Sequence, residues 1–271
     1  MRKSEYLSSK SVIDFIAWIE PMLDTPQSFA HEYFHNKKKK TYKFDNIFSA
    51  YKSYDWAWER TIEELAENLT KSVDESNENT CQKVCYDILN WGGVLNAGNK
   101  NRIVQLAPNL CHYLRVVRDR FDMDFTSNGY FFKGFQMTSG FSKIYSALLD
   151  NYIIYDSRVG AALGLLVREY CINSGLFAIP RELCFAWTSG RGKQIRNPSC
   201  DKYAFPKLRI YKEYEYLENN IRANWLLSAV AKSTKSKFSD VKASLRLRTL
   251  EQALFMIGYD LTGYQNIKLL D

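Results

Sequence analysis

The clearest structural signal in the sequence is the segment Asp156-Ser157-Arg158-Val159-Gly160-Ala161-Ala162-Leu163-Gly164-Leu165-Leu166-Val167-Arg168-Glu169-Tyr170. Its apolar side chains recur at the three- and four-residue spacing that forms one helix face. The residues on that face are Val159, Ala162, Leu163, Leu166, Val167 and Tyr170. Asp156 stands just before the stripe, and aspartate is a favoured residue at the start of a helix. The segment therefore predicts a long helix that begins beside Asp156.

The same spacing recurs along most of the chain. Apolar stripes predict helices near residues 12–19, 58–69, 81–89, 103–121, 214–231 and 241–257, with a break near Pro108 and with Gly258 as the C′ residue of the last helix. Glycine and proline are scarce, at 13 and 6 residues, and we find no strong strand alternation. We therefore predict an all-α fold with about nine or ten helices. The lysine-rich stretch at 30–53 is interpreted as a solvated loop or, less commonly for such runs, as a phosphate contact.

The composition is that of a folded globular chain. The 271 residues are 46% hydrophobic and 25% charged, which excludes a disordered or collagen-like protein. We expect a single helical domain over residues 1–271. No apolar run approaches the roughly 20 residues needed to span a bilayer, and no secretory signal is visible after Met1. Six cysteines in so long a chain predict reduced, mostly buried thiols in a cytoplasmic protein.

The charge of the chain is unevenly distributed. The formal net charge is +7, yet residues 187–248 alone hold 14 Lys and Arg against 5 Asp and Glu. Residues 61–90 are acidic, with seven Asp and Glu against two lysines. One basic face on a near-neutral body indicates a polyanionic partner. The alternative is a basic surface that serves only solubility.

Common catalytic motifs are absent: the sequence holds no phosphate-binding loop, no dinucleotide-binding glycine motif and no nucleophile elbow. The three histidines form no metal-binding pattern, although His31 and His35 are spaced to share a helix face. We therefore expect no metal and no cofactor.

The remaining candidate is residues 137–164. There, a tight turn at Gly140 is predicted to join two helices, the second of which carries Lys143, and Asp156 opens the next helix. Unpaired N–H groups at a helix start, approached closely at a glycine, can hold one DNA phosphate. A lysine and a carboxylate placed side by side beneath that phosphate would act on the adjoining sugar.

Two runs in this stretch carry a family resemblance. They are Ser139-Gly140-Phe141-Ser142-Lys143-Ile144-Tyr145 and Ile154-Tyr155-Asp156-Ser157-Arg158-Val159-Gly160-Ala161-Ala162-Leu163-Gly164. Together they resemble the helix-hairpin-helix DNA glycosylase superfamily, and within it the compact bacterial members of the 8-oxoguanine DNA glycosylase branch. The catalytic lysine and aspartate of that branch match Lys143 and Asp156. The chain departs from the family in having one hairpin glycine, Gly140, and a shorter interval between the two catalytic positions.

The resemblance implies a two-lobed, all-α glycosylase-like fold, with the hairpin and catalytic segment near 135–170 and the basic C-terminal portion at 187–248. It implies a nucleoid-associated bacterial enzyme that flips a base out of double-stranded DNA and excises it. The base would be an oxidised purine or a bulky modified base, such as those in phage DNA. Lys143 would attack the sugar C1′, and the resulting imine would permit AP-lyase activity. Asp156 would deprotonate Lys143 or stabilise the oxocarbenium-like sugar.

Several residues are expected to contact DNA around this site. They are Ser139, Gly140, Phe141, Ser142, Arg158, Arg191, Lys193 and Arg196. The aromatic residues Tyr130, Phe131, Phe132 and Phe135 are expected to form a wedge or stacking wall or, more commonly for such residues, to pack in the core. We expect no membrane partner and no obligatory protein partner.

Structural roles and other functions stand beside this interpretation. Asp156 is also a plausible simple helix cap, Lys143 a solvated lysine and Gly140 an ordinary turn glycine. Two alternative functions are a non-catalytic helix-hairpin-helix DNA-binding protein and a scaffold whose basic loop binds an acidic protein. Burial of Lys143 and Asp156 together in a pocket would favour the enzyme, and DNA binding that weakens steeply with salt would argue against the scaffold.

Overall fold

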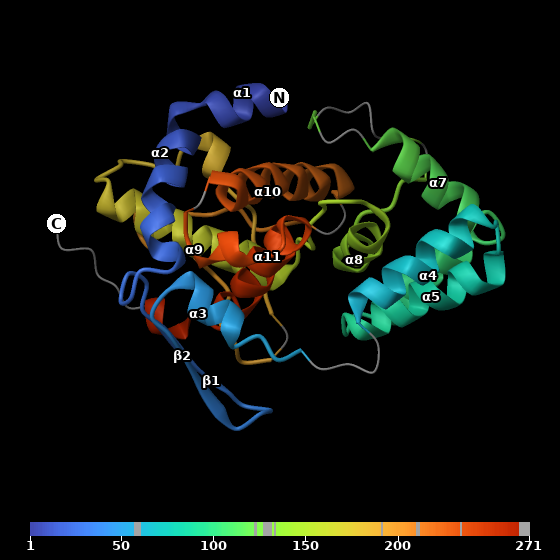
Figure 1. Ribbon diagram of the computed structural model, residues 1–271, viewed down its shortest axis with the longest axis horizontal. Coiled ribbons are helices and arrows are strands. Elements are labelled where there is room, and N and C mark those ends of the chain that lie inside the picture. The colour runs from blue at the N-terminus through green and yellow to red at the C-terminus, as the bar shows by residue number, and fades with distance from the viewer. Residues whose placement is uncertain are drawn as a thin grey trace.

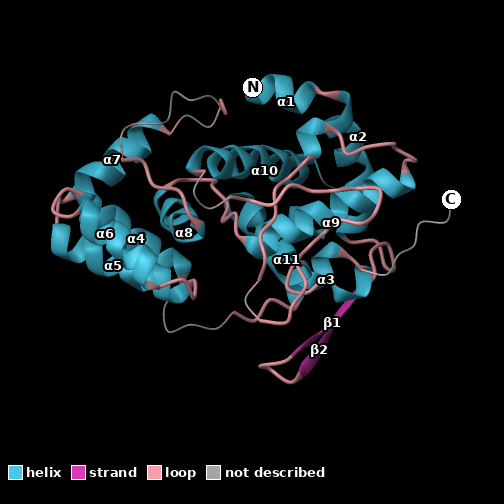
Figure 2. Ribbon diagram, turned by 180° about the vertical axis from the view of Figure 1, so that it is seen from behind, coloured by secondary structure: helices cyan, strands magenta, loops and turns pink. Residues whose placement is uncertain are grey.

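The computed structural model describes residues 1–56, 61–121, 124–126, 132, 134–190, 192–209, 212–233 and 235–265. Within these residues the chain forms 11 α-helices and a two-stranded antiparallel hairpin (Figures 1 and 2). The α-helices are α1 (Lys3–Ser8), α2 (Lys10–Ile19), α3 (Ile47–Lys52), α4 (Ile62–Asp74), α5 (Glu78–Trp91), α6 (Ala97–Leu106), α7 (Leu110–Arg120), α8 (Ser139–Leu148), α9 (Ser157–Asn173), α10 (Glu213–Ser233) and α11 (Arg246–Ile257). The strands are β1 (His31–His35) and β2 (Lys40–Phe44), and short 3-10 helices are η1 (Glu20–Leu23), η3 (Arg181–Leu183), η4 (Lys237–Asp240), η5 (Ala243–Leu245) and η6 (Thr262–Tyr264). A mostly helical fold is confirmed, whereas a purely α-helical chain is not.

Helices α8 and α9 follow each other in sequence but pack against different neighbours. Helix α8 packs against α4 and α5, and α4 also packs against α7. Helix α9 packs against α2 and α11, and α11 also contacts α3 and α10. In Figure 1, α4, α5 and α7 accordingly lie on one side of α8, with α9, α10 and α11 on the other. The link between α8 and α9 therefore joins two parts of the helical core.

Helix α9 begins at the residue that the sequence indicated. Asp156 caps it, because its Oδ1 atom accepts the N–H groups of Arg158 at 2.9 Å and of Val159 at 3.3 Å. The residues from Val159 to Val167 are all buried, so the helix runs through the interior rather than along the surface. Gly164 admits the loop that follows η3, since a Cβ there would lie 2.4 Å from Cγ of Pro198.

Gly258 ends α11, but not in the conformation expected of a C′ glycine. Its φ of −78° lies outside the left-handed region. A Cβ at this position would lie only 1.8 Å from the backbone oxygen of Arg158. The glycine therefore allows the end of α11 to pack directly on the first turn of α9, where the candidate catalytic aspartate is placed.

Gly140 is the second residue of α8 rather than a turn residue between two helices. Thr138 caps α8 through its side-chain oxygen, which accepts two backbone N–H groups of the first turn, each at 3.2 Å. Residues 134–138, which immediately precede the helix, are not helical. A Cβ at Gly140 would lie 2.6 Å from the side-chain nitrogen of Asn99. The prediction of a tight interhelical turn here is therefore wrong, and the glycine instead makes room for the side chains of Asn99 on α6 and Leu89 on α5.

The lysine-rich stretch at 30–53 forms a β-hairpin followed by α3, and the loop that we expected is limited to the exposed lysine run at the connection between the two strands. The register pairs His31 with Phe44, Glu32 with Lys43, Tyr33 with Tyr42, Phe34 with Thr41 and His35 with Lys40. Tyr33, Tyr42 and Phe44 are buried, while the charged residues between them are exposed. This is the period-two pattern of a strand with one face on the core. His31 and His35 consequently share a strand face rather than a helix face.

His31 is expected to make the fold sensitive to acid. It is 5% exposed, and burial lowers its pKa from 6.5 to about 4. Because the unfolded chain then binds the proton more readily, stability falls as the pH drops from about 6.5 to about 4, by about 2 to 3 kcal/mol in all. Urea unfolding at pH 7 and pH 4.5 should show a smaller loss for His31→Phe than for the wild type. An equal loss in both proteins would contradict a neutral, buried His31.

The cysteines occupy the positions expected of packing residues. Cys81 and Cys85 on α5 are buried, as predicted from their helical spacing, and so are Cys111 and Cys171. Cys184 and Cys200 are half-buried, and all are free thiols. Among the helices that the structure describes, none is both long and apolar enough to cross a membrane.

Candidate active site

Lys143 and Asp156 meet where α8 and α9 approach each other. The Nζ atom of Lys143 lies 3.3 Å from Oδ2 of Asp156, and it also donates to the backbone oxygen of Ser139 at 3.3 Å. Lys143 is 3% exposed, and the side chain of Asp156 is 13% exposed. Lysine is almost never buried to this extent without a paired acid. The structure thus brings together the two residues that the sequence placed side by side.

Asp156 is held in its charged form. Burial by itself would raise the pKa of the carboxyl group, but the Lys143 ammonium, followed by Arg158 and Arg196, outweighs burial, and the pKa lies below its ordinary value. The two oxygens have separate partners, because Oδ1 accepts the N–H groups at the start of α9 and Oδ2 faces Lys143. One side chain therefore begins a helix and supplies a negative charge to the site.

Side chains from other helices fix the extended link that carries Asp156. The Ser142 hydroxyl on α8 accepts the N–H of Tyr155 at 2.8 Å and itself donates to a side chain of α10 at 3.1 Å. Glu251 on α11 accepts the N–H of Ile154 at 3.0 Å. The backbone N–H groups of the two residues before Asp156 are thus bound by side chains of two different helices. These hydrogen bonds hold Asp156 in place in addition to the bonds that it makes as the cap of α9.

The aliphatic stem of Lys143 passes directly over Gly92, at the end of α5. A Cβ at Gly92 would lie 2.3 Å from Cδ and 2.5 Å from Cε of Lys143. In the sequence, Trp91-Gly92-Gly93 indicated only the end of a helix. Gly93 has the positive φ, of 64°, that favours glycine, whereas Gly92 provides the space through which the amine reaches Asp156.

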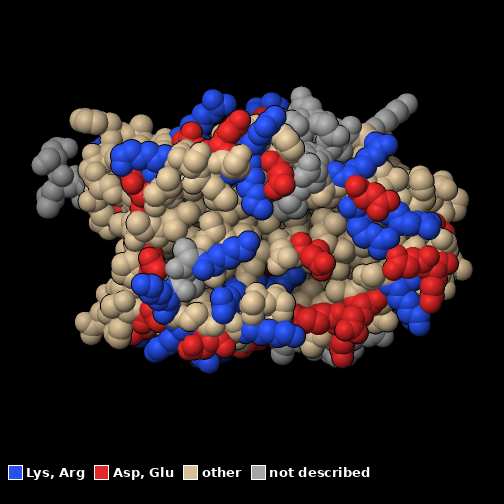
Figure 3. Space-filling view, turned by 45° about the horizontal axis from the view of Figure 1, so that its top comes forward, with Lys and Arg blue, Asp and Glu red and all other residues tan. Residues whose placement is uncertain are grey.

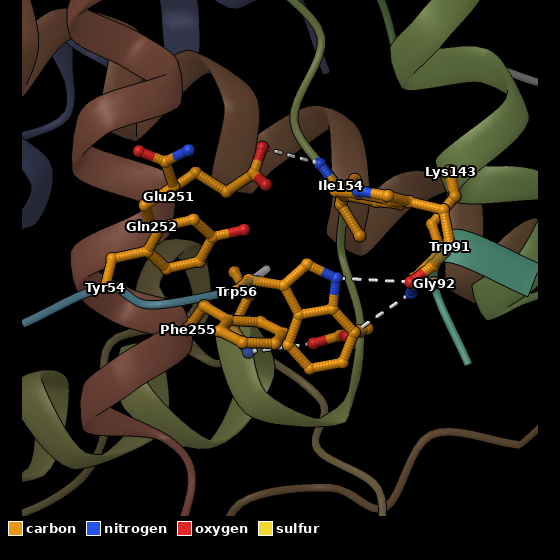
Figure 4. Close-up of a pocket in the computed structure, with 11 residues that line it drawn as sticks. Tyr54, Trp56, Trp91, Gly92, Lys143, Ile154, Glu251, Gln252 and Phe255 are labelled. Atoms are coloured by element: carbon orange, nitrogen blue, oxygen red, sulfur yellow. Dashed lines mark hydrogen bonds and ion pairs between the residues drawn. The ribbon is translucent and has the colours of Figure 1, made fainter. Parts of the chain in front are cut away.

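Lys143 and Asp156 line a pocket whose other walls are largely aromatic (Figure 4). The pocket is partly open to solvent. Its lining residues are Tyr54, Trp56, Trp91, Gly92, Lys143, Ile154, Asp156, Val159, Glu251, Gln252 and Phe255. The ring of Trp56 lies 5.4 Å from that of Phe255, and its Nε1 donates to the backbone oxygen of Trp91 at 3.2 Å. The arrangement offers ring surfaces to a flat ligand beside a buried amine and a carboxylate.

No pattern in the sequence indicated the aromatic wall of the pocket. Tyr54 and Trp56 follow α3, Trp91 ends α5, and Phe255 lies on α11. These segments are far apart in the chain, and each aromatic residue resembles a core residue in its own segment. The only available signal was the high aromatic content of 15%.

A second carboxylate, that of Glu251, also lines the pocket. Burial raises its pKa, although Arg248 beside it opposes this effect. Both of its oxygens accept hydrogen bonds from Arg248, at 3.0 and 2.8 Å. Glu251 is therefore occupied with Arg248 and with the link before α9, and it acts as a positioning residue for Asp156.

Arg158, two residues after Asp156, lies among aromatic rings. Its guanidinium carbon is 3.9 Å from the ring centre of Phe255, 5.0 Å from that of Tyr259 and 5.6 Å from that of Trp56. None of the carboxylates that the structure describes lies within 4 Å of this guanidinium as an ion-pair partner. Burial lowers its pKa. An arginine desolvated in this way, without an acidic partner, is available to an anionic ligand.

The other residues expected to contact DNA are not gathered on one surface. Gly140, Phe141 and Ser142 are buried in α8, and their backbone N–H groups donate to oxygens of Thr138, so they are not presented to a phosphate. Ser139 is half-buried, and its backbone oxygen holds Lys143. Lys193 is exposed. Arg191 lies outside the described residues.

Arg196 also lies inside the protein. It is 8% exposed, and its guanidinium donates to the hydroxyl of Ser157 and, at 3.3 Å, to the backbone oxygen of Tyr259. The loop that carries it is thereby tied to the first turn of α9. Arg196 contributes positive charge close to Asp156 but does not present it on the surface.

Part of the positive surplus at 187–248 is engaged in contacts within the protein rather than presented on a basic face. Arg222 is buried and donates to backbone oxygens near η3. Arg246 donates to the backbone oxygen of Val241 at 3.0 Å, and Arg248 pairs with Glu251. On the face shown in Figure 3, positive and negative side chains are interleaved. These three arginines therefore stabilise the fold through contacts within the protein.

The aromatic residues before α8 pack in the core where the structure describes them. Phe135 is buried and stacks on Tyr145 with ring centres 5.9 Å apart. Phe132 contacts Phe135 in turn, at 5.8 Å. Tyr130 and Phe131 lie outside the described residues. Of the two roles expected for these aromatic residues, Phe132 and Phe135 therefore have the second, which is packing in the core.

No metal site accompanies the pocket in the described part of the chain, where no group of three or more His, Cys, Asp or Glu side chains is arranged around a common point. In comparisons with protein-family models, with curated proteins and with solved structures, no match to this chain was found. The function must therefore be inferred from the chemistry of the site.

Proposed function

We propose that this protein is a DNA N-glycosylase that flips a damaged or modified base out of double-stranded DNA and excises it. The observation that carries the proposal is the buried pair of Lys143 and Asp156, 3.3 Å apart, in the wall of an aromatic pocket. Burying an amine and a carboxylate is unfavourable unless they are paired, and such pairs in clefts are typical of functional sites. A DNA-binding protein without catalytic activity would have no need of this arrangement.

Lys143 is the nucleophile in this proposal. After losing a proton, Nζ attacks C1′ of the flipped nucleotide, the bond from C1′ to the base nitrogen breaks, and the base leaves with a proton. Opening of the sugar ring then gives an imine between Nζ and C1′. Elimination of the 3′ phosphate from this imine would nick the strand, and hydrolysis would restore the lysine.

Asp156 acts mainly through its charge. Because its pKa is held below the ordinary value, the carboxylate is ionised at neutral pH and is a weak base. A fixed negative charge beside C1′ stabilises the positive charge that develops on the sugar as the base departs. Removal of a proton from Lys143 is its secondary role.

The pocket walls suit a base and its phosphate. Stacking of a base on an aromatic side chain contributes about 1–3 kcal/mol, and Gln252 supplies an amide that can hydrogen-bond to a base edge. The unpaired guanidinium of Arg158 suits the adjoining phosphate. In this proposal the helices packed around α8 and those packed around α9 correspond to the two lobes of the helix-hairpin-helix glycosylases. The substrate is an oxidised purine or a bulky modified base, such as those in phage DNA.

The test is a glycosylase screen. Purified protein is incubated in excess with duplexes that each contain one damaged or phage-type modified base, and alkali-labile sites are counted. We expect cleavage of at least one modified duplex and none of the unmodified control. Absence of alkali-labile sites throughout, together with absence of borohydride-trapped protein on abasic DNA, would overturn the proposal.

Gly92→Ala is expected to impair the site without unfolding the protein. The added methyl group meets the flexible stem of Lys143 rather than backbone, so the amine is displaced while the packing is kept. We expect borohydride trapping on abasic-site DNA to fall at least about tenfold, because small misplacements of reacting groups have effects of this size or larger. Gly263→Ala, where a Cβ would meet nothing within 4 Å, is the matched control. Trapping of Gly92→Ala at the wild-type rate would contradict the placement of Lys143.

A further inference from the structure

The β-hairpin carries a tip of consecutive lysines. Residues 36–39 connect β1 to β2, and Lys37 to Lys40 are all exposed. In Figures 1 and 2 the hairpin extends beyond the helices of the body. A partner can therefore approach this tip without displacing other elements.

Three of the four lysines form no ion pair with a carboxylate of the described residues. Lys38 is paired with Asp55, with 2.6 Å between Nζ and Oδ1, and further along β2 Lys43 is paired with Glu32 at 2.8 Å. For Lys37, Lys39 and Lys40, no carboxylate of the described residues lies within ion-pair distance. Uncompensated positive charge concentrated at a projecting tip favours a polyanion.

The tip is held at a fixed place beside the candidate active site. Tyr42 donates its hydroxyl hydrogen to Oδ2 of Asp55 at 2.5 Å, and Lys38 donates to the backbone oxygen of the same residue at 3.2 Å. The next residue, Trp56, lines the pocket. The hairpin is therefore fastened to the chain segment that forms one pocket wall.

Stacked rings make a second connection between the hairpin and the site. Tyr259 stacks on His35 with ring centres 4.3 Å apart and on Tyr33 at 4.9 Å. The same ring lies 5.0 Å from the guanidinium carbon of Arg158. Because the buried ring of Tyr259 contacts both strand β1 and Arg158, the hairpin is packed onto the same part of the interior that holds this arginine beside the pocket.

We infer that the hairpin tip, defined as Lys37, Lys39 and Lys40, binds the phosphodiester backbone of duplex DNA outside the nucleotide held in the pocket. The inference rests on the proposed function, which places DNA at the pocket. Contacts from flexible lysines at a tip hold phosphates without reading sequence. The hairpin therefore contributes to affinity for any duplex, whereas Lys143 and Asp156 act only on the flipped nucleotide.

The test is the salt dependence of binding to an unmodified duplex, measured by fluorescence anisotropy. Each phosphate contact contributes about 0.9 to the slope of log affinity against log salt. In the triple variant Lys37→Gln, Lys39→Gln, Lys40→Gln we expect the magnitude of this slope to fall by about two to three. A charge-matched control replaces Lys83, Lys100 and Lys202 by glutamine; these exposed residues lie on α5, on α6 and in the loop after η3, and none of them lines the pocket. The control should keep the wild-type slope.

A slope in the hairpin variant equal to that of the wild type, or an equal fall in the control variant, would overturn the inference. So would displacement of the duplex by polyglutamate as readily as by competing duplex, because this would show that the tip binds acidic protein chains. Borohydride trapping on abasic DNA at saturating protein and low salt should remain at the wild-type level in the hairpin variant. If the hairpin variant still forms the trapped complex and has the wild-type salt slope, only the hairpin contact is rejected. If the hairpin variant has a reduced slope but the wild-type protein forms no trapped complex, only the proposed glycosylase activity is rejected.

Discussion

Asp156→Asn is expected to reduce the single-turnover rate of base release about a hundred- to a thousandfold, the size of effect seen when a preorganised charge or donor is removed from an active site. Asparagine caps helices as well as aspartate does, and its side-chain oxygen can take over the bonds to the N–H groups of Arg158 and Val159. The variant therefore keeps the start of α9 and loses only the negative charge that faces Lys143. Base release is measured on the duplex identified in the screen, and duplex affinity is measured alongside.

Asp156→Ala is the matched control, because it removes the cap together with the charge. Loss of a helix cap costs about 1 kcal/mol, and the buried Lys143 ammonium is left without a partner in both variants. The free energy of unfolding should therefore rank wild type, then Asp156→Asn, then Asp156→Ala. Full activity of Asp156→Asn on an identified substrate would show that the carboxylate is a structural cap and that the proposed mechanism is wrong.

Lys143→Ala is expected to abolish the borohydride-trapped complex with abasic-site DNA. The aldehyde form of an abasic sugar reacts directly with the Lys143 amine, so this assay does not require the natural base to be known. Among the described residues, no other lysine lines the pocket. Removing one partner of a buried ion pair destabilises a protein by about 3 kcal/mol or more, so trapping is measured at a temperature where circular dichroism shows the variant to be folded.

Lys143→Met provides the control for packing. Methionine keeps an apolar stem over Gly92 but has no amine, so it should recover part of the lost stability and none of the trapping. Lys83→Ala, on the exposed surface of α5, should trap like the wild type. Persistent trapping in Lys143→Met would exclude Lys143 as the residue that forms the imine.

The helices were largely predictable from apolar spacing. The stripe before Tyr170 placed α9 and its cap, and the stripes near 214–231 and 241–257 correspond to α10 and α11. These segments are long, and burial of one face or of all faces leaves a strong periodic signal. The start of α6 was missed, because its polar residues after Asn96 resemble a turn although Asn96 caps the helix.

The hairpin and the pocket walls depend on contacts that a linear pattern does not contain. Strands β1 and β2 have five residues each, and their inward residues are mainly tyrosine and histidine, which are also common in loops. Gly140, predicted as a turn residue, is needed because side chains of α5 and α6 pack against it, and Gly258, predicted as a C′ residue, because α11 packs on α9. In each case a tertiary contact, rather than local backbone conformation, determines the residue.

The candidate site likewise contains residues that the sequence indicated and residues that only the structure identifies. Lys143 and Asp156 were identified from their order and from the residues around them, and the structure places the amine and the carboxylate in contact. Trp56, Phe255 and Gln252 come together only when α3, α5, α9 and α11 are assembled. Their roles could not be inferred from segments that, taken singly, look like ordinary helix ends and core faces.

The decisive measurement locates the trapped adduct on the chain. Wild-type protein is reduced with borohydride on abasic-site duplex and digested with a protease, and the peptide that carries the sugar remnant is sequenced by mass spectrometry. The mechanism predicts a single modified residue, Lys143, on the peptide from α8. A remnant on another lysine or on the terminal amine, or no adduct on DNA that the protein demonstrably binds, would contradict it.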